Sequence, residues 1–343
     1  MSFSKILATW YLDKKRDLPW RKTTNPYYIW LSEIMLQQTR VAQGLPYYEA
    51  FTQTFPTVFD LANANEEQVL KLWQGLGYYS RARNLHTTAK YIASELNGIF
   101  PTNYNDLLKL KGVGEYTAAA IASFSYNEVV PVVDGNVYRV LARYFDVATD
   151  IASAKAKKEF TDLAFEVISK ENPALFNQSI MEFGALQCVP KNPNCSICPL
   201  NNSCAALALD KVNQLPVKIK KLKVKHRFLN YLYIFDNENK TTINKRTEKG
   251  IWHNLYELPL VETEIETSDV EILSLIKSKI ENISDIRLLE SDAIIHKLTH
   301  QHLNIKFWKI KQNNVFENGL DFESLNKFPF PIVLHNFIEK NKF

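Results

Sequence analysis

All four cysteines of the chain lie within one short loop, with the spacing C-x6-C-x2-C-x5-C: Cys188, Cys195, Cys198 and Cys204. Cysteines that pack in a core would follow a helix or strand period instead. Structural zinc usually takes two C-x2-C pairs or a cysteine and histidine mixture, and this loop has a single such pair. A 4Fe-4S cluster needs four thiolates, one per iron, which one continuous loop can supply. The pattern favours an iron-sulfur site over the two alternatives, zinc and disulfides.

A second group of residues lies between two helical patterns upstream. Gly112 and Gly114 stand one residue apart, which allows a tight turn whose amides bind a phosphate at a helix N-terminus. A simple turn between helices is an equally good interpretation of these two glycines alone. Twenty residues after Gly114, Asp134 follows an apolar segment and precedes Gly135. A carboxylate in that context is much less common than the glycine turn alone.

The elements that position these residues fall into two domains, consistent with 343 residues. Residues 1–212 carry apolar positions at helical spacing and predict an all-α domain that includes the loop 188–204. Residues 213–225 are basic and predict a linker. Residues 226–343 predict an α+β domain, with a hairpin formed by 231–235 and 241–243, a helix capped by Ser268 or Asp269, and a strand at 303–307.

The composition is that of a globular protein, with 46% hydrophobic and 23% charged residues. The first twelve residues form too short an apolar stretch for a membrane span and lack a small-residue cleavage site. We therefore expect a cytoplasmic protein with no membrane association. A net charge of +4 permits a nucleic-acid partner without requiring one.

The glycine turn followed by Asp134 resembles the helix-hairpin-helix glycosylase superfamily, and the cysteine spacing is similar to that of its iron-sulfur members. Two further segments, residues 31–39 (LSEIMLQQT) and 73–85 (WQGLGYYSRARNL), resemble the MutY family of adenine DNA glycosylases nearly residue for residue. The resemblance is close over the first two hundred residues and looser beyond them. It implies a base-excision repair enzyme that acts as a monomer on double-stranded DNA containing adenine opposite 8-oxoguanine or guanine.

By this resemblance Glu33 is the general acid and Asp134 stabilises the oxocarbenium ion. The residues themselves support both roles. Glu33 flanks an apolar, aromatic helix face, where partial desolvation would raise its pKa, whereas Asp134 lies beside backbone amides and is expected to stay ionised. Tyr116 and Asn136 match positions that support these two groups. Tyr116 also replaces the Schiff-base lysine of the lyase branch, which implies a monofunctional glycosylase.

The resemblance also implies a set of residues that contact DNA or the base: Arg21, Leu36, Gln38, Tyr78, Gly112, Gly114, Thr299 and His300. The C-terminal domain resembles a Nudix-like module that recognises 8-oxoguanine. It lacks the Arg-Glu-x-x-Glu-Glu helix of a working Nudix hydrolase. Family members usually carry Phe-Ser-His in the recognition loop, where this chain has Leu298, Thr299 and His300. The alternatives are another mismatch or damaged-base glycosylase of the superfamily and a non-catalytic iron-sulfur protein that scans DNA.

Overall fold

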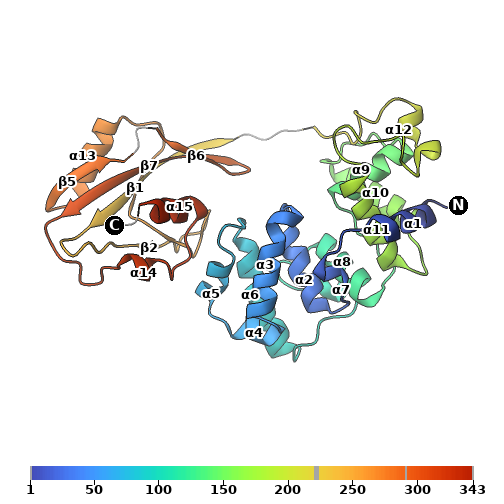
Figure 1. Ribbon diagram of the computed structural model, residues 1–343, viewed down its shortest axis with the longest axis horizontal. Coiled ribbons are helices and arrows are strands. Elements are labelled where there is room, and N and C mark those ends of the chain that lie inside the picture. Colours follow the sequence, from blue (N-terminus) through green and yellow to red (C-terminus); the bar gives the residue numbers. More distant parts are fainter. Residues whose placement is uncertain (1, 220–223, 290–291, 342–343) are drawn as a thin grey trace. The chain divides into compact units, whose positions relative to one another are not determined.

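The computed structural model describes residues 2–219, 224–289 and 292–341, and the chain folds into two compact units (Figure 1). The first unit comprises Met1–Asn63 and Asn84–Lys220, and the second comprises Ala64–Arg83 and Lys221–Phe343. Segment 64–83 thus belongs with the C-terminal residues. The boundaries 1–212, 213–225 and 226–343 stay predictions, and residues 220–223 of the expected linker lie outside the described residues.

The first unit is helical. Its elements are α1 (Phe3–Lys14), η1 (Pro19–Arg21), α2 (Pro26–Leu36), α3 (Val41–Thr54), α4 (Val58–Asn63), α6 (Ser80–Glu95, which begins in the second unit), α7 (Tyr104–Leu107), α8 (Glu115–Tyr126), α9 (Gly135–Phe145), α10 (Ala154–Val167), α11 (Pro173–Leu186), η2 (Asn201–Ser203) and α12 (Ala205–Ala208). Helix α11 packs against α1, α8 and α9. The core that α1, α9, α10 and α11 share contains Leu141, Phe160, Phe176 and Phe183, all buried.

Local sequence fixes where the two site-bearing helices begin. Asn25 caps α2, because its side chain accepts a hydrogen bond from the amide of Tyr27 (3.0 Å), and Pro26 occupies the first turn, where no N–H is needed. Asp134 caps α9 by accepting from the amides of Asn136 and Val137, both at 2.8 Å. The candidate carboxylate of Asp134 is therefore held at a helix N-terminus.

Among the described residues, the second unit contains α5 (Glu66–Leu72), the start of α6, a five-stranded sheet and three helices of the C-terminal part. Its strands are β1 (Lys225–Phe235), β4 (Leu260–Thr263), β5 (Ile283–Leu288), β6 (Ile294–Lys297) and β7 (Gln301–Gln312), and its other helices are α13 (Asp269–Lys279), α14 (Phe322–Leu325) and α15 (Ile332–Lys340). Strands β2 (Asn244–Lys245) and β3 (Tyr256–Glu257) pair separately. The sheet order is β4-β1-β7-β5, with β6 also on β7. The fold expected from the sequence, an all-α domain followed by an α+β domain, is confirmed.

Strand pairing differs from the expected hairpin. Strand β1 pairs in parallel with β7, from Lys225 opposite Gln301 to Phe235 opposite Lys311, and β4 is its antiparallel neighbour. Segment 241–243 contributes two isolated bridges, from Thr241 to Phe235 and from Thr241 to Leu320, rather than a strand. The turn signal at 236–240 was correct, because the amide of Asp236 bonds to the carbonyl of Lys240 (3.0 Å). The prediction of a hairpin was wrong because the long-range partner satisfies the β1 backbone instead.

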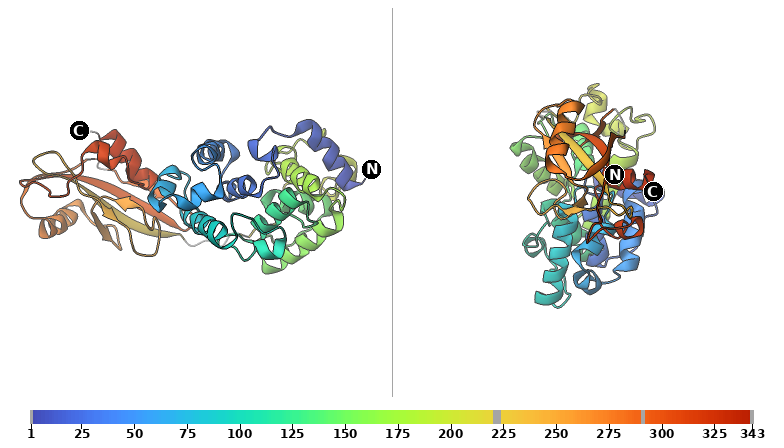
Figure 2. Two further views of the ribbon diagram at one scale, coloured as in Figure 1. Left: turned by 90° about the horizontal axis from the view of Figure 1, so that it is seen from below. Right: turned by 90° about the vertical axis from the view of Figure 1, so that its left-hand side faces the viewer.

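The two faces of the sheet are covered by different helices, as Figure 2 shows for α13 and α15. Leu232 and Ile234 of β1 pack with Ile272 and Ile276 of α13. On the opposite face, the ring of Phe337 from α15 stacks on Phe307 at 3.6 Å. The alternation of side chains along β1 and β7 therefore buries both faces of the central strand pair.

Segment 64–83 is held in the second unit by polar contacts. The Lys71 ammonium donates to the carbonyl of Phe328 (3.2 Å), and the side chain of Gln74 accepts from the amide of Phe330 (3.0 Å). The Glu67 carboxylate accepts from the Tyr256 hydroxyl (2.6 Å). Such bonds between residues far apart in the chain have no local sequence signal.

Candidate active site and iron-sulfur loop

One pocket of the first unit collects all four of the predicted catalytic residues. Its lining includes Glu33 and Leu36 of α2, Tyr116 of α8, Asp134 and Asn136 at the start of α9, Arg21 of η1 and Glu182 of α11. These side chains come from five separate segments and meet only in the folded chain. Gly112, Gly114, Gln38, Tyr78, Thr299 and His300 do not line this pocket.

Glu33 is almost fully buried, with 6% of its surface exposed. Burial and the charge of Asp134 raise the pKa of Glu33, a hydrogen bond from Tyr116 lowers it, and the net result is a pKa of about 7. The pKa of the Tyr116 hydroxyl is raised well above its ordinary value by burial, so this group stays a neutral donor. Glu33 can therefore hold a proton near neutral pH and release it, as a general acid must.

Asp134 uses both carboxylate oxygens at the start of α9. One oxygen accepts from the two backbone amides of its cap, and the other accepts from the side-chain amide of Asn136 at 2.8 Å. Burial raises the pKa of Asp134, while the hydrogen bonds from Val137 and Asn136 oppose that rise. The expectation that Asp134 stays ionised rested on those hydrogen bonds alone and took no account of burial.

The lining of the same pocket includes a third acid that was not predicted from the sequence. Glu182 accepts from the Arg16 guanidinium at 2.5 and 2.8 Å and from the Arg21 guanidinium at 2.7 and 2.8 Å. Burial alone would raise the pKa of Glu182, but the hydrogen bonds from Arg16 and Arg21 bring it down to about 2. The sequence feature that could have indicated Glu182 is its position as the single acid within the otherwise mainly apolar segment 179–186.

Asn136 is in turn held by Arg139, a second residue that was not predicted from the sequence. The Arg139 guanidinium donates to the Asn136 side-chain oxygen (2.8 Å) and to the carbonyl of Gly184 (2.6 Å). It also donates to the backbone carbonyl of Cys188 (2.7 Å). A continuous set of hydrogen bonds thus runs from Asp134 to the first cysteine of the iron-sulfur loop.

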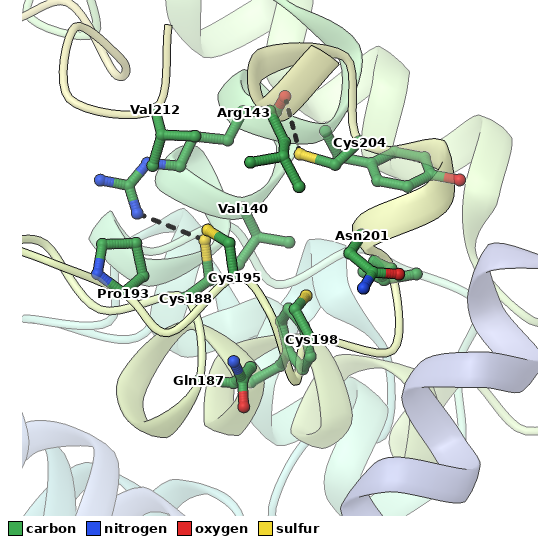
Figure 3. A pocket seen from close by; sticks show the side chains of 14 residues that line it. Val140, Arg143, Gln187, Cys188, Pro193, Cys195, Cys198, Asn201, Cys204 and Val212 are labelled. Atoms are coloured by element: carbon green, nitrogen blue, oxygen red, sulfur yellow. Dashed lines mark hydrogen bonds between the residues drawn. The ribbon is translucent and has the colours of Figure 1, made fainter. Parts of the chain in front are cut away.

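The four cysteines surround one pocket whose other walls are mainly apolar (Figure 3). None of them forms a disulfide. The Arg143 guanidinium lies 3.4 Å from the Cys188 sulfur, and burial raises the pKa of Cys198 to about 11. Such a thiol ionises at neutral pH only beside a positive partner, which a metal centre supplies. The donor set and its apolar, half-buried setting fit a cluster in which each thiolate binds a different iron.

Within the part of the chain that the structure describes, no three or more His, Cys, Asp or Glu side chains are arranged to hold a single metal ion. A 4Fe-4S cluster does not need such an arrangement, because its ligands are spread over four irons.

The two glycines lie in a turn that leads directly into a helix. Gly112 has φ +77°, a left-handed conformation, and an added Cβ would lie 2.6 Å from Cβ of Asn84. Gly114 is the N-cap of α8. Both the backbone angle and the close approach of α6 therefore require glycine at 112.

Two of the residues predicted to enter the DNA helix have unusual backbone angles. Gln38 has φ +55° and Tyr78 has φ +46°, and positive values are rare for bulky side chains. Tyr78 is 46% exposed. Its hydroxyl lies 2.6 Å from the Thr299 hydroxyl within the second unit, and the Arg81 guanidinium lies over its ring. The structure thus brings together Tyr78 and Thr299, which the sequence indicated only as separate positions.

Thr299 and His300 lie in the turn between β6 and β7. This turn is closed by a hydrogen bond from the amide of Leu298 to the carbonyl of Gln301 (2.8 Å). The predicted recognition loop is therefore the tip of a β-hairpin, where side chains are accessible to a partner.

Three family models match the chain. They are the HhH-GPD superfamily base excision DNA repair protein over residues 31–164, the iron-sulfur binding domain of endonuclease III over 188–204 and the NUDIX domain over 230–340. The iron-sulfur match confirms the 4Fe-4S cofactor expected for the cysteine loop. No helix among the described residues is long and apolar enough to cross a membrane.

Curated relatives and solved structures agree with these matches. The chain is 38% identical to an adenine DNA glycosylase of Buchnera aphidicola subsp. Schizaphis graminum, over 91% of this chain and 90% of that protein. It is 43% identical to the adenine DNA glycosylase of Homo sapiens, over 60% of this chain and 39% of that protein. Among solved structures, a thermostable thymine-DNA glycosylase matches with a TM-score of 0.55 and 27% identity, covering 60% of this chain and 95% of the other.

Proposed function

The chain belongs to the adenine DNA glycosylases, and from that premise we propose that its substrate is adenine mispaired with 8-oxoguanine or guanine in duplex DNA. The observation that carries the proposal is the pair of carboxylates in one pocket. Glu33 has a pKa near 7, and Asp134 is held by three hydrogen bonds at the start of α9. Both acids are buried, but the hydrogen bonds at the start of α9 favour the anionic form of Asp134, which supports Glu33 as the proton donor and Asp134 as the stabilising anion.

In the proposed reaction, protonated Glu33 donates its proton to N7 of a flipped adenine. The glycosidic bond then breaks, its electron pair leaves with the neutral base, and positive charge develops on the sugar. The Asp134 carboxylate stabilises that charge. Glu33, now ionised, accepts a proton from a water molecule whose oxygen bonds to C1′ of the sugar. The products are free adenine and an abasic site, and Glu33 regains its proton.

The surrounding residues have supporting roles in this proposal. Tyr116 donates a hydrogen bond to Glu33, and Asn136 fixes Asp134. Arg21, bound to Glu182, forms a polar wall for the base. Because position 116 is a tyrosine, the chain has no amine there for a Schiff base, which supports a monofunctional glycosylase. When bound, the 4Fe-4S cluster would hold the loop 188–204 in one conformation through its four cysteine ligands.

We assign DNA recognition to Leu36 of the pocket lining and to residues outside the pocket. The amides of the turn at Gly112 and Gly114 bind a backbone phosphate. Leu36, Gln38 and Tyr78 occupy the space left by the flipped base, whose unstacking costs a few kcal/mol. Thr299 and His300 at the β6–β7 turn contact the base opposite adenine. The enzyme acts on this DNA as a monomer.

The test is strand breakage by alkali after incubation with duplexes that each contain one defined mispair. We expect breakage at adenine opposite 8-oxoguanine and opposite guanine, and none in the matched A:T duplex. The Glu33→Gln variant is the control for contaminating glycosylases. Breakage at thymine in a T:G duplex would instead support a thymine mismatch enzyme. Tight binding of the mispaired duplexes without breakage would support a non-catalytic scanning protein.

A further inference from the structure

The segment that leads into Asp134 has no regular secondary structure. Residues 127–134 connect α8 to α9 without forming a helix or strand. Pro131 and Val132 within it are buried. A buried, irregular segment must satisfy its backbone polar groups with side chains, since neither a helix nor a sheet ladder supplies partners.

One side chain of α11 supplies two of those partners. The side-chain oxygen of Asn177 accepts a hydrogen bond from the amide of Val132 at 3.0 Å. Its side-chain nitrogen donates to the carbonyl of Val130 at 2.9 Å and to the hydroxyl of Ser123 at 2.9 Å. The side-chain amide of Asn177 thus pairs with one backbone N–H and one backbone C=O of the loop, as a neighbouring strand would. Its third hydrogen bond, to Ser123, connects α11 to α8.

Asn177 is held in place by the packing of its helix. Only 1% of its surface is exposed. Its helix α11 also carries Gly184, where an added Cβ would lie 2.9 Å from the backbone oxygen of Asn136. Helix α11 therefore touches the backbone on both sides of Asp134, through Asn177 before it and through Gly184 after it.

We propose that Asn177 is a positioning residue for base excision, which holds segment 130–132 so that the Asp134 carboxylate faces the reacting sugar. The inference rests on the function proposed above for Asp134. Asn177 does not line the pocket with Glu33 and Asp134 and acts only through the loop. A displacement of about 1 Å in a catalytic group can slow a reaction roughly 100-fold, so loss of this bridge has a large expected effect on the chemical step.

The test compares Asn177→Leu, which has a similar size but no amide, with Ser179→Ala. Ser179 is a matched control, because it is fully buried on the same helix and its hydroxyl bonds only locally, to the carbonyl of Leu175 (2.6 Å). For each variant, the single-turnover rate is measured per active molecule, together with affinity for the mispaired duplex and thermal stability. We expect Asn177→Leu to lose roughly 100-fold in rate with affinity retained within about tenfold, while Ser179→Ala keeps the rate.

A purely structural role predicts a different result, in which Asn177→Leu lowers the melting temperature but the surviving molecules excise adenine at the parental rate. That result would overturn the inference. If Asn177→Leu does not fold, Asn177→Asp serves, because it keeps an oxygen for the Val132 amide and loses both N–H donors. We then expect about a tenfold loss in rate, and a parental rate would again overturn the inference. Asp134→Asn separates the two proposals, since parental excision by that variant would contradict the function assigned to Asp134.

Discussion

Removing the Tyr116 hydroxyl tests whether Glu33 works as a proton donor. In Tyr116→Phe the ring is kept and the hydrogen bond to Glu33 is lost. That bond favours the carboxylate, so its loss raises the pKa of Glu33, which burial already raises to about 7. A hydrogen bond to a charged group contributes roughly 1.5–3 kcal/mol, and about 1.36 kcal/mol corresponds to one pKa unit, so the expected rise is about 1–2 units.

The sign of the effect on activity follows from the proposed role. If Glu33 must be protonated for the chemical step, the rate falls as the pH rises through its pKa. In the parental enzyme that fall is centred near pH 7. In Tyr116→Phe it moves upward by about 1–2 pH units. The plateau at lower pH can fall as well, because Tyr116 lines the pocket, but the midpoint of the fall reports the pKa alone.

The assay is single-turnover excision from an A:8-oxoguanine duplex across a range of pH. Tyr126→Phe is the control, because Tyr126 lies on the same helix and its hydroxyl bonds instead to the carbonyl of Phe100 (3.5 Å). We expect the control profile to match that of the parental enzyme. A Tyr116→Phe profile with an unmoved midpoint, or one moved to lower pH, would refute the proposed coupling between Tyr116 and Glu33.

Three further predictions concern the lyase question, the cluster and the opposite base. Borohydride should trap little covalent complex with the parental enzyme, and efficient trapping would show that another amine acts as a lyase. Protein purified anaerobically should contain about four irons per chain, and stoichiometric zinc without iron would contradict the cluster assignment. Cys198→Ser should lower the iron content and the DNA affinity more than it lowers the excision rate of the molecules that remain folded. Thr299→Val removes the hydroxyl that bonds to Tyr78, and it should reduce the preference for 8-oxoguanine over guanine by up to about tenfold, whereas an unchanged preference would exclude Thr299 from recognition.

Much of the catalytic site was predictable because its signals are local. The run of aromatic and aliphatic residues around Glu33 predicted a buried helix flank and a raised pKa, and both are present. The clustered cysteines predicted the iron-sulfur loop. Ser268 was predicted as a possible helix cap, and the structure shows a capping box in which Ser268 and Glu271 bond reciprocally. In each case neighbouring residues determine the environment.

The rest depends on contacts between distant residues. The Glu182 pair with Arg16 and Arg21 joins residues more than 160 positions apart, and no local pattern indicates which arginine an acid will meet. The parallel pairing of β1 with β7 likewise joins strands that the sequence shows only as separate apolar runs. The hydrogen bonds of Asn177 also depend on distant residues. Asparagine within a helix is usually neutral or unfavourable for helix stability, so the helix sequence does not indicate that this side chain binds the loop before Asp134.

The most direct test of the account is the single-turnover rate of Glu33→Gln on a duplex with one A:8-oxoguanine pair. Glutamine keeps the size and hydrogen-bonding capacity of the side chain but has no proton to transfer at this site. The account predicts that excision is abolished while the variant binds the mispaired duplex within about tenfold of the parental affinity. Excision by Glu33→Gln at close to the parental rate would contradict the assignment of Glu33 as the general acid.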